Sequence, residues 1–461
     1  MVIPRSDRIA TTIPASAELD ASIAMTYARR LLDDLGRGAV PAGEADHPAM
    51  SWVCSGLAEL TGYRGGAPLV APIGLSAAAD GALAALSALA GQDRPFGTLT
   101  GATLLGERGR IAGFTRQGNI SPGGGCRLLP TQDGMLAVSL VRPSDWELMP
   151  AWTGEDIRDW KGLTPVLRKR PTAEWLEQGR LLGLALADAD PRAAPSEAWH
   201  ETIVQRPGHP ARRRGPRVVD LSALWAGPLC ADLLGRLGGS VIKVESKGRP
   251  DGARTGAPDF YGRLNGGKSS VALDFTDTAD RAVLLNLIQS ADIVVEGSRP
   301  RALRQLGIHA EEIVATSPGV TWISITGHGR SAPGGDWTGF GDDAAVAAGL
   351  SRLMRDAHGE WLFCGDAIAD PLTGIHAALL AWNSWQTGGS TLHSISLKGV
   401  VASVIARDSL KDASTLRSRT ARWQAIANGA DLPLYELPTA RGVVEASGAS
   451  NQTILAGSQP C

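Results

Sequence analysis

Apolar and polar positions alternate most regularly from residue 217 onward. A β-branched run, RVVDLS, is followed by a WAGP turn, the amphipathic stretch LCADLLGRLGG and a second apolar run, SVIKVE. This change of period predicts a strand, a helix and a second strand. Further strand-like runs at 270–273, 292–296 and 320–325 are separated by helical patterns at 278–289 and 301–306. We therefore predict an α/β fold with a doubly wound, Rossmann-like parallel sheet.

The pattern differs upstream of this region. CRLLPTQDGMLAVSL predicts a hairpin that turns at Asp133–Gly134, so residues 100–187 are expected to form a smaller α+β domain with a glycine loop. Residues 188–216 are rich in Pro, Ala and Arg, lack periodicity and are interpreted as a linker. The large α/β domain then covers 217–406, including a long helix at 371–385, and 407–461 form a C-terminal return segment and tail.

An internal repeat connects the two ends of the chain. Aligning Gly56 with Gly349 gives an offset of 293 residues (349 minus 56), which also pairs Gly81 with Gly374. In addition, ARRLLDDLG at 28–36 resembles CADLLGRLG at 230–238. Chance similarity of Ala- and Leu-rich helices is the alternative. The repeat predicts that residues 1–99 are a degenerate partial copy of the large domain.

Composition excludes several classes of partner. The 461 residues carry a formal net charge of -2, which gives no electrostatic reason to expect nucleic acid or a membrane surface as the main partner. The five cysteines are scattered without metal-ligand spacing, so we expect reduced thiols, no metal site and a cytoplasmic location. The most apolar run, 67–79, is too short to span a bilayer.

One carboxylate occupies a position suited to chemistry. In CGDAIADPLTGIHAALLAW, Asp370 stands beside Pro371 where a glycine-containing loop becomes a helix. A nucleophilic carboxylate would lie in such a place. An ordinary helix start has the same composition, because Asp is a favoured N-cap and Pro a favoured first residue. At the offset of the repeat, the first copy has Ala77 instead.

The ends of the predicted strands carry many cations. An NAD site is disfavoured, because the first turn contains only Gly227 and no GxGxxG motif. Coenzyme A is a longer nucleotide whose phosphates need Arg forks, Lys charges and helix N-termini. The candidate cations follow the second and fourth strands or precede the third, and they are Lys243, Lys247, Arg249, Arg254, Lys268, Arg299, Arg301 and Arg304.

Several motifs in this order resemble a known family. VVDLSALWAGPLCADLLGRLGGSVIKVE, NGGKSSVALDF, ADIVVEGSRPRALRQLGI, VTWISITGHG, GDAIADPLTGIHAALLAW and QTGGSTLHSISL resemble the class III CoA-transferases. That family includes the formyl-CoA and carnitine CoA-transferases and, as a branch, the α-methylacyl-CoA racemases. SPGGGCRLLPTQDGMLAVSL resembles the family's small domain, which here precedes the large one.

The resemblance implies a mechanism and a set of site residues. Asp370 would attack an acyl-CoA thioester, giving a mixed anhydride and then an aspartyl-CoA thioester, from which an acceptor acid takes the CoA. Coenzyme A is then a substrate, and no cofactor is permanently bound. Gly123, Gly124 and Gly125 match the loop that closes over the site. The implied CoA contacts are Trp225, Ala226, Lys247, Leu273, Gly297, Ser298 and Leu306, with Arg301 or Arg304 supplying phosphate charge.

The chain also departs from the family. Gly297-Ser298 replaces a usual Asn-Phe pair, which weakens the expected grip on adenine. Asp342 stands where the racemases have a catalytic His, so racemisation lacks its imidazole, and a racemase-like enzyme remains the alternative. A CoA-binding pseudoenzyme is a third reading. Because the family forms interlocked dimers, both a homodimer and a pseudo-dimeric monomer are expected possibilities.

Overall fold

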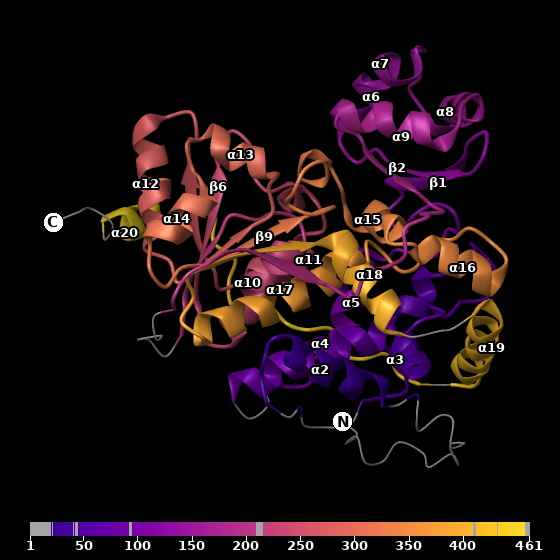
Figure 1. Ribbon diagram of the computed structural model, residues 1–461, viewed down its shortest axis with the longest axis horizontal. Coiled ribbons are helices and arrows are strands. Elements are labelled where there is room, and N and C mark those ends of the chain that lie inside the picture. Colours follow the sequence, from indigo (N-terminus) through magenta and orange to yellow (C-terminus); the bar gives the residue numbers. More distant parts are fainter. Residues whose placement is uncertain are drawn as a thin grey trace.

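The computed structural model describes residues 20, 22–39, 41, 45–91, 95–208, 215–408, 412–430 and 432–456. Figure 1 shows a group of N-terminal helices at the bottom, a small domain at the upper right and a large domain built on a sheet. Within the described residues, no helix is long and apolar enough to cross a membrane.

A seven-stranded sheet forms the large domain. Its order is β4-β10-β9-β8-β5-β6-β7, and all neighbours are parallel except β4 and β10. Without β4, this is the order of two βαβαβ halves that meet between β5 and β8. The strands are β4 (His200–Gln205), β5 (Arg217–Asp220), β6 (Ser240–Ser246), β7 (Ser269–Leu273), β8 (Ile293–Glu296), β9 (Thr321–Thr326) and β10 (Thr391–Ser396). The predicted doubly wound α/β fold is confirmed.

Helices cover both faces of this sheet. Every residue of β8 and β9 is buried, as expected for parallel strands enclosed on two sides. The covering and connecting helices are α10 (Ala226–Arg236), η3 (Gly252–Thr255), α11 (Pro258–Asn265), α12 (Thr278–Gln289), α13 (Pro300–Gln305), α14 (Ala310–Thr316), η4 (Gly334–Asp336), α15 (Gly341–Ala347), α16 (Leu350–His358), α17 (Ala369–Gln386) and α18 (Leu397–Arg407).

The segment expected to be a linker, 188–216, contains strand β4. This strand pairs antiparallel with β10 and forms the edge of the sheet. Its sequence, HETIVQ, is largely exposed or half-buried, so it lacks the apolar signature of the inner strands. The linker prediction is therefore wrong for 200–205. Residues 209–214 lie outside the described part of the chain.

The small domain is an antiparallel sheet, β1-β2-β3, with helices on it. The predicted hairpin is confirmed, because β1 and β2 pair from Cys126↔Ser139 to Pro130↔Met135 and so turn through Asp133–Gly134. The elements are β1 (Cys126–Pro130), β2 (Met135–Ser139), α6 (Pro143–Glu147), α7 (Met149–Thr153), α8 (Trp160–Leu167), α9 (Thr172–Leu181) and β3 (Ala185–Asp188).

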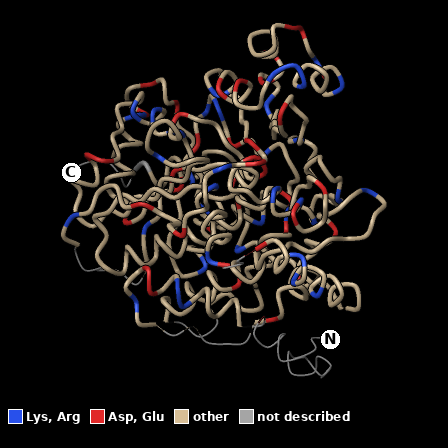
Figure 2. The backbone as a smooth tube through the Cα atoms, turned by 45° about the vertical axis from the view of Figure 1, so that its right-hand side comes forward, with Lys and Arg blue, Asp and Glu red and all other residues tan. Residues whose placement is uncertain are grey.

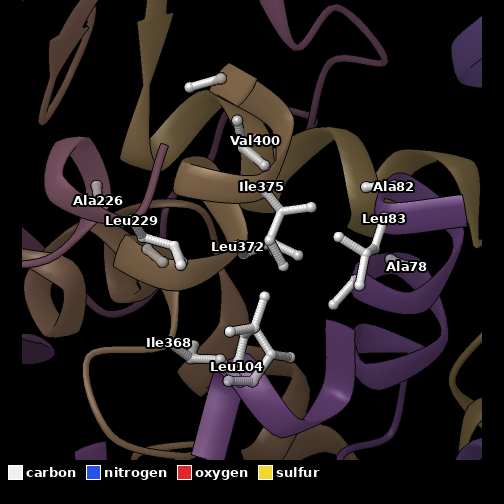
Figure 3. Close-up of a cluster of buried hydrophobic side chains, with 14 of the residues drawn as sticks. Ala78, Ala82, Leu83, Leu104, Ala226, Leu229, Ile368, Leu372, Ile375 and Val400 are labelled. Carbon is white, nitrogen blue, oxygen red and sulfur yellow. The ribbon is translucent and has the colours of Figure 1, made fainter. Parts of the chain in front are cut away.

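Helix α5 was expected in the small domain but packs elsewhere. It belongs with the N-terminal elements α2 (Ile23–Asp34), α3 (Pro48–Cys54), η2 (Leu57–Leu60), α4 (Leu75–Ala90) and α5 (Gly101–Ala112). Figure 3 shows Leu104 of α5 and Leu83 of α4 facing Leu372 and Ile375 of α17 across one apolar core. Burial of these side chains fixes α5 there, so the boundary of the small domain follows α5.

The same close contact occurs in two helix pairs of this core, α2 with α4 and α10 with α17. A Cβ on Gly81 of α4 would overlap the carbonyl oxygen of Ala24 in α2, and a Cβ on Gly374 of α17 would lie 2.7 Å from the carbonyl oxygen of Ala226 in α10. Ala24 and Ala226 are separated by the offset that aligns ARRLLDDLG with CADLLGRLG, 202 residues (226 minus 24). Glycine at these two positions lets each pair of helices approach closely.

The C-terminal segment returns across the molecule. It follows α19 (Ala413–Gly429) and ends in α20 (Asn451–Ala456). The Tyr435 main-chain N–H donates to the Cys54 carbonyl at 2.7 Å, and Arg441 Nε donates to Asp232 at 2.8 Å. Glu445 accepts a hydrogen bond from the Ser270 N–H at 2.7 Å. The segment thus connects the N-terminal helices to the large domain.

Candidate active site

Asp370 lies in the first turn of α17, at the carboxyl edge of the parallel sheet. The C-terminal end of α17 leads into β10, so its N-terminal end is at the opposite edge, where open α/β sheets bind ligands. The side chain is half-buried, and the Gly341 N–H donates to its carboxylate. A Cβ at Gly341 would overlap both Asp370 Oδ2 and the Ala367 carbonyl oxygen. Glycine at 341 is therefore what allows the main chain to reach the carboxylate.

Two further carboxylates and one guanidinium surround Asp370. Asp366 is fully buried and accepts two hydrogen bonds from Arg108, from Nε and Nη2, both at 2.7 Å. Asp342 accepts a hydrogen bond from the Ala367 N–H at 2.8 Å, and Ala367 has a left-handed φ of 42°. These contacts hold the loop between Asp366 and Asp370 in one shape.

The electrostatics of the group favour a protonated Asp370. Burial raises the pKa of Asp370 to about 7, Arg108 opposes the rise, and the Asp342 charge adds to it. Burial also raises the pKa of Asp342 to about 6, and the neighbouring Asp366 contributes. Arg108 itself is desolvated, but the carboxylates around it, Asp366 first, raise its pKa. Asp370 is thus a carboxyl group that ionises near neutral pH rather than near pH 4.

The glycine loop reaches this group through one of its three glycines. A Cβ on Gly123 would lie 3.5 Å from Arg108 Nη2 and 3.7 Å from Asp366 Oδ1, so Gly123 faces the carboxylates. Gly124 has a φ of 77° and makes the turn. Gly125 faces Val141 of the small domain, because a Cβ there would lie 2.6 Å from that side chain.

The predicted CoA contacts at the first turn lie beside the meeting point of the two sheet halves. A Cβ on Gly297 would lie 3.5 Å from Ser222 Cβ, which places the ends of β5 and β8 together. Gly297 is exposed and Ser298 is half-buried. The Trp225 side chain is buried against Phe260, with ring centroids 5.2 Å apart, and Ala226 begins α10. In this conformation the indole is part of the core.

The remaining predicted contacts are more scattered. Leu273 is buried at the end of β7, and its carbonyl accepts the Lys247 N–H at 2.8 Å. The Lys247 side chain is exposed and pairs with Asp280 at 3.3 Å. Leu306 is half-buried after α13. The structure therefore places these residues at the edge of β6, β7 and α13, and it does not bring them into contact with Asp370.

Several cations in the predicted phosphate cluster are structural. Lys243 pairs with Asp251 and Lys268 with Asp220, each at 2.9 Å, and all four side chains are buried. Arg254 forms hydrogen bonds with Glu245. Lys243 and Lys268 therefore point into the large domain and neutralise buried carboxylates there. The expectation that these two lysines bind phosphate is wrong, whereas Arg254 remains partly exposed beside Glu245.

A cleft of about 770 Å³ lies between the small domain and the large domain. Acidic and basic residues are interspersed along the chain (Figure 2), and the cleft contains both kinds. On one side, Arg299 has a pKa lowered by burial and by the neighbouring Arg301, Arg142 and Arg249. Opposite, Arg180 of α9 stacks on Trp337 with its guanidinium carbon 3.7 Å from the ring centre. The four arginines in the lining are Arg142, Arg180, Arg299 and Arg301.

The cleft separates the two arginines that the sequence left as alternatives. Arg301 lines it, whereas Arg304 on the same helix, α13, lies outside the lining and pairs with Glu311 at 2.8 Å. Sequence reasoning missed Arg108, Arg142 and Arg180. Arg108 comes from α5 and is 258 residues away from Asp366, so no local pattern relates the two.

Neither nearby histidine is available as a base. His376 is fully buried, its Nδ1 donates to the Leu372 carbonyl at 2.7 Å, and its Nε2 accepts from Tyr27 at 2.9 Å. His328 packs edge-on against Trp337, and burial lowers its pKa to about 3. The acid–base groups next to Asp370 are thus carboxyls and a guanidinium.

Comparisons with known proteins agree on one family. Residues 214–422 match the family model described as CoA-transferase family III. The chain is 29% identical over 251 residues to succinyl-CoA:glutarate CoA-transferase from Homo sapiens, covering 52% of this chain and 56% of that protein. It is 30% identical to acetyl-CoA:oxalate CoA-transferase from Acetobacter aceti (35% and 48%) and 33% identical to succinyl-CoA–D-citramalate CoA-transferase from Chloroflexus aurantiacus (38% and 45%). The chain spans about half the length of these relatives.

Proposed function

We propose that this chain moves CoA from an acyl-CoA donor to a carboxylic acid acceptor, with Asp370 as the nucleophile. The premise is that residues 214–422 belong to CoA-transferase family III. The observation that carries the proposal is the half-buried Asp370 carboxylate. It lies at a helix N-terminus, accepts the Gly341 N–H and has Arg108 as its cation. Such a site lets a carboxylate ionise near neutral pH while its surroundings limit the access of water.

The reaction begins with attack on the donor. An Asp370 oxygen adds to the thioester carbonyl, the C–S bond breaks, and CoA leaves as the thiolate. The thiolate then attacks the Asp370 carbonyl of the mixed anhydride, which releases the donor acid and leaves an aspartyl-CoA thioester. Main-chain N–H groups at Gly341 and in the glycine loop, 123–125, would stabilise the oxyanions of both steps.

The second half of the reaction reverses these steps with a new acid. The acceptor carboxylate attacks the aspartyl-CoA thioester and releases CoA thiolate. The thiolate then attacks the acceptor side of the new anhydride, which gives acceptor-CoA and restores Asp370. Coenzyme A enters and leaves as a substrate, so the cycle needs no resident cofactor.

The cleft between the domains would hold the nucleotide end of CoA. Arg299 and Arg301 stand at the start of α13, next to the exposed Gly297, and Arg180 and Arg142 face them from the small domain. Arginine forks in such a place suit the diphosphate and 3'-phosphate. Lys247, Leu273 and Leu306 would then lie near the adenosine or play only a structural part.

Trapping the covalent intermediate tests the proposal. Acyl-CoA with hydroxylamine or borohydride should place a label on Asp370 in the wild type and none in Asp370→Asn, with turnover reduced at least about a thousandfold in the variant. Donors would be acetyl-, formyl- and succinyl-CoA, and acceptors oxalate, glutarate and D-citramalate. Tight CoA binding without any label would instead indicate a pseudoenzyme. Deuterium wash-in at the α-carbon of a 2-methylacyl-CoA would indicate a racemase.

We also propose that the N-terminal helices are a degenerate partial copy of the large domain. The matching contacts of Gly81 with Ala24 and of Gly374 with Ala226 support it. Ala77 of α4 stands at the position of Asp370, so only one site per chain would carry the nucleophile. The trapping experiment should then give one adduct per chain. Light scattering distinguishes a pseudo-dimeric monomer from a homodimer.

A cytoplasmic location is part of the same proposal. Three cysteines in the described part of the chain, Cys126, Cys230 and Cys364, are free and buried. Unpaired thiols suit the reducing compartment in which acyl-CoA pools are used.

A further inference from the structure

Arg108 is a cation that the N-terminal region contributes to the candidate active site. Helix α5 lies outside the segment that matches the family, 214–422. The guanidinium is held by Asp366 through Nε and Nη2. Its central carbon lies 5.1 Å from the centre of the Trp225 ring and 5.9 Å from the centre of the Phe114 ring. Its side chain nevertheless remains 28% exposed, whereas Asp366 is fully buried. One edge of a firmly held guanidinium is therefore left for a ligand.

The charges around Asp370 need this cation in both halves of a transfer reaction. Among the described residues, the largest effects of neighbouring charges on Asp370 come from Arg108, Asp342 and Asp366. Asp370 loses its negative charge when it becomes a thioester. An acceptor carboxylate arriving at that moment brings one negative charge back to the same place. Without Arg108, the acceptor would approach Asp342 and Asp366, and the negative charge of these carboxylates repels it at close range.

The surroundings of Arg108 also direct an acid toward the reacting carbon. Gly123 of the glycine loop faces the pair of Arg108 and Asp366, because a Cβ added there would lie within contact distance of Arg108 Nη2 and of Asp366 Oδ1. An acid bound to the free edge of Arg108 would thus lie between the loop and the first turn of α17. Arginine binds carboxylates in a planar, directional way, which orients the attacking oxygen as well as neutralising it.

On these grounds we propose that Arg108 binds the carboxylate of the acceptor acid and presents it to the acyl carbon of Asp370. The inference rests on the proposed CoA-transferase function and adds to it a residue that selects an anionic acceptor. A neutral nucleophile such as hydroxylamine would not need Arg108, because it carries no charge to be paired.

The test compares acids with a neutral nucleophile in variants of one helix. Arg108→Lys keeps the charge and loses the fork. Arg108→Met removes both the charge and the fork. In that variant the buried Asp366 would have no cation to pair with, so the double variant Arg108→Met, Asp366→Asn also removes the Asp366 charge. Arg110→Met is the matched control, because Arg110 is another half-buried arginine of α5, two residues farther along. All proteins would be assayed at about pH 9, where a carboxyl of pKa about 7 is ionised.

The expected result is a selective loss of acid acceptance. With the panel acid that turns over fastest, the acceptor KM should rise at least about tenfold in Arg108→Met and in the double variant, and less in Arg108→Lys. Formation of the Asp370 adduct is expected to slow in Arg108→Met, because Arg108 also lowers the pKa of Asp370, so the readout is cleavage of the preformed adduct. The ratio of the cleavage rate with the acid to the rate with hydroxylamine should fall at least about tenfold relative to the wild type. Arg110→Met should resemble the wild type in every assay.

Two results would overturn the inference while leaving the proposed function intact. One is an unchanged acceptor KM in Arg108→Met or the double variant. The other is an equal loss with the acid and with hydroxylamine, or recovery of the acid reaction in the double variant, since both mean that Arg108 acts only by holding Asp366. Failure of the wild type to form any Asp370 adduct would overturn the proposed function itself and this inference with it.

Discussion

Asp370 is subject to opposing electrostatic effects that together set the pH at which it ionises. Burial and the Asp342 charge raise its pKa to about 7, while Arg108 and the Gly341 N–H hold the value down. A nucleophilic carboxylate must be ionised, but a strongly solvated one is a poor nucleophile. With a pKa of about 7, roughly half of Asp370 is ionised near neutral pH, and the ionised form is only partly hydrated because the side chain is half-buried.

This balance predicts the pH dependence of adduct formation. Because the Asp370 pKa is raised, the reactive ionised form accumulates as pH increases, so the rate should rise with pH and level off above about 7. Asp342→Asn removes a neighbouring negative charge. The rising part of the pH–rate profile should therefore move to lower pH by about half a unit to one unit. The introduced amide retains an oxygen that can accept the Ala367 N–H, so the loop is expected to persist.

Single-turnover rates of Asp370 labelling across the pH range would measure this shift. Glu174→Gln, a substitution of an exposed residue of α9 in the small domain and outside the cleft lining, serves as the control for a general change of charge. If the rate rises at the same pH in Asp342→Asn as in the wild type, or at a higher pH, the result contradicts the electrostatic account of the site.

At the scale of elements, the position of Asp370 depends on how closely α17 approaches α10. The missing side chain of Gly374 gives room for the Ala226 carbonyl and for Leu229, whose Cβ would lie 3.1 Å from a new Cβ. Four residues separate Gly374 from Asp370, about one helical turn. A displacement of α17 at this contact is therefore transmitted to Asp370, the proposed nucleophile.

The two equivalent glycines offer a matched pair of substitutions. Gly374→Ala and Gly81→Ala should each destabilise the protein by about 1–3 kcal/mol, because each forces two packed helices apart. Only Gly374→Ala moves α17 directly, so it should also lower the single-turnover rate about tenfold or more. Urea unfolding and Asp370 labelling measure the two effects. Equal loss of labelling in both variants would mean that the contact between α2 and α4 also positions Asp370.

The sequence predicted the strands that are buried on both faces of the sheet and missed the strand at its edge. RVVD, IVVE and TWISIT are apolar strands enclosed on both faces, and their bounds were close to those observed. HETIVQ lies at the edge, so its polar residues hid β4. Asp370 could be selected from its position at a helix start. Arg108 could not, because its approach to Asp366 results from tertiary packing of α5 alone.

At the scale of the whole molecule, the cleft joins two domains that share no sheet. Arg142 and Arg180 come from the small domain, and Arg299 and Arg301 from the large one. A polyanion bound there would contact both domains at once. Binding should therefore stabilise their relative position as well as the native state.

Arginine substitutions on α13 test where the phosphates of CoA bind. Arg301→Gln removes a cation from the cleft and should weaken CoA binding about tenfold, with a smaller effect on a pantetheine thioester that has no phosphate. Arg304→Gln changes the same residue type on the same helix, but outside the cleft and in a surface pair with Glu311, so CoA binding should be retained. Titration calorimetry and the CoA-induced rise in Tm measure the difference. If Arg304→Gln weakens CoA binding and Arg301→Gln does not, the phosphates bind on the outer side of α13, and the cleft between the domains serves another ligand.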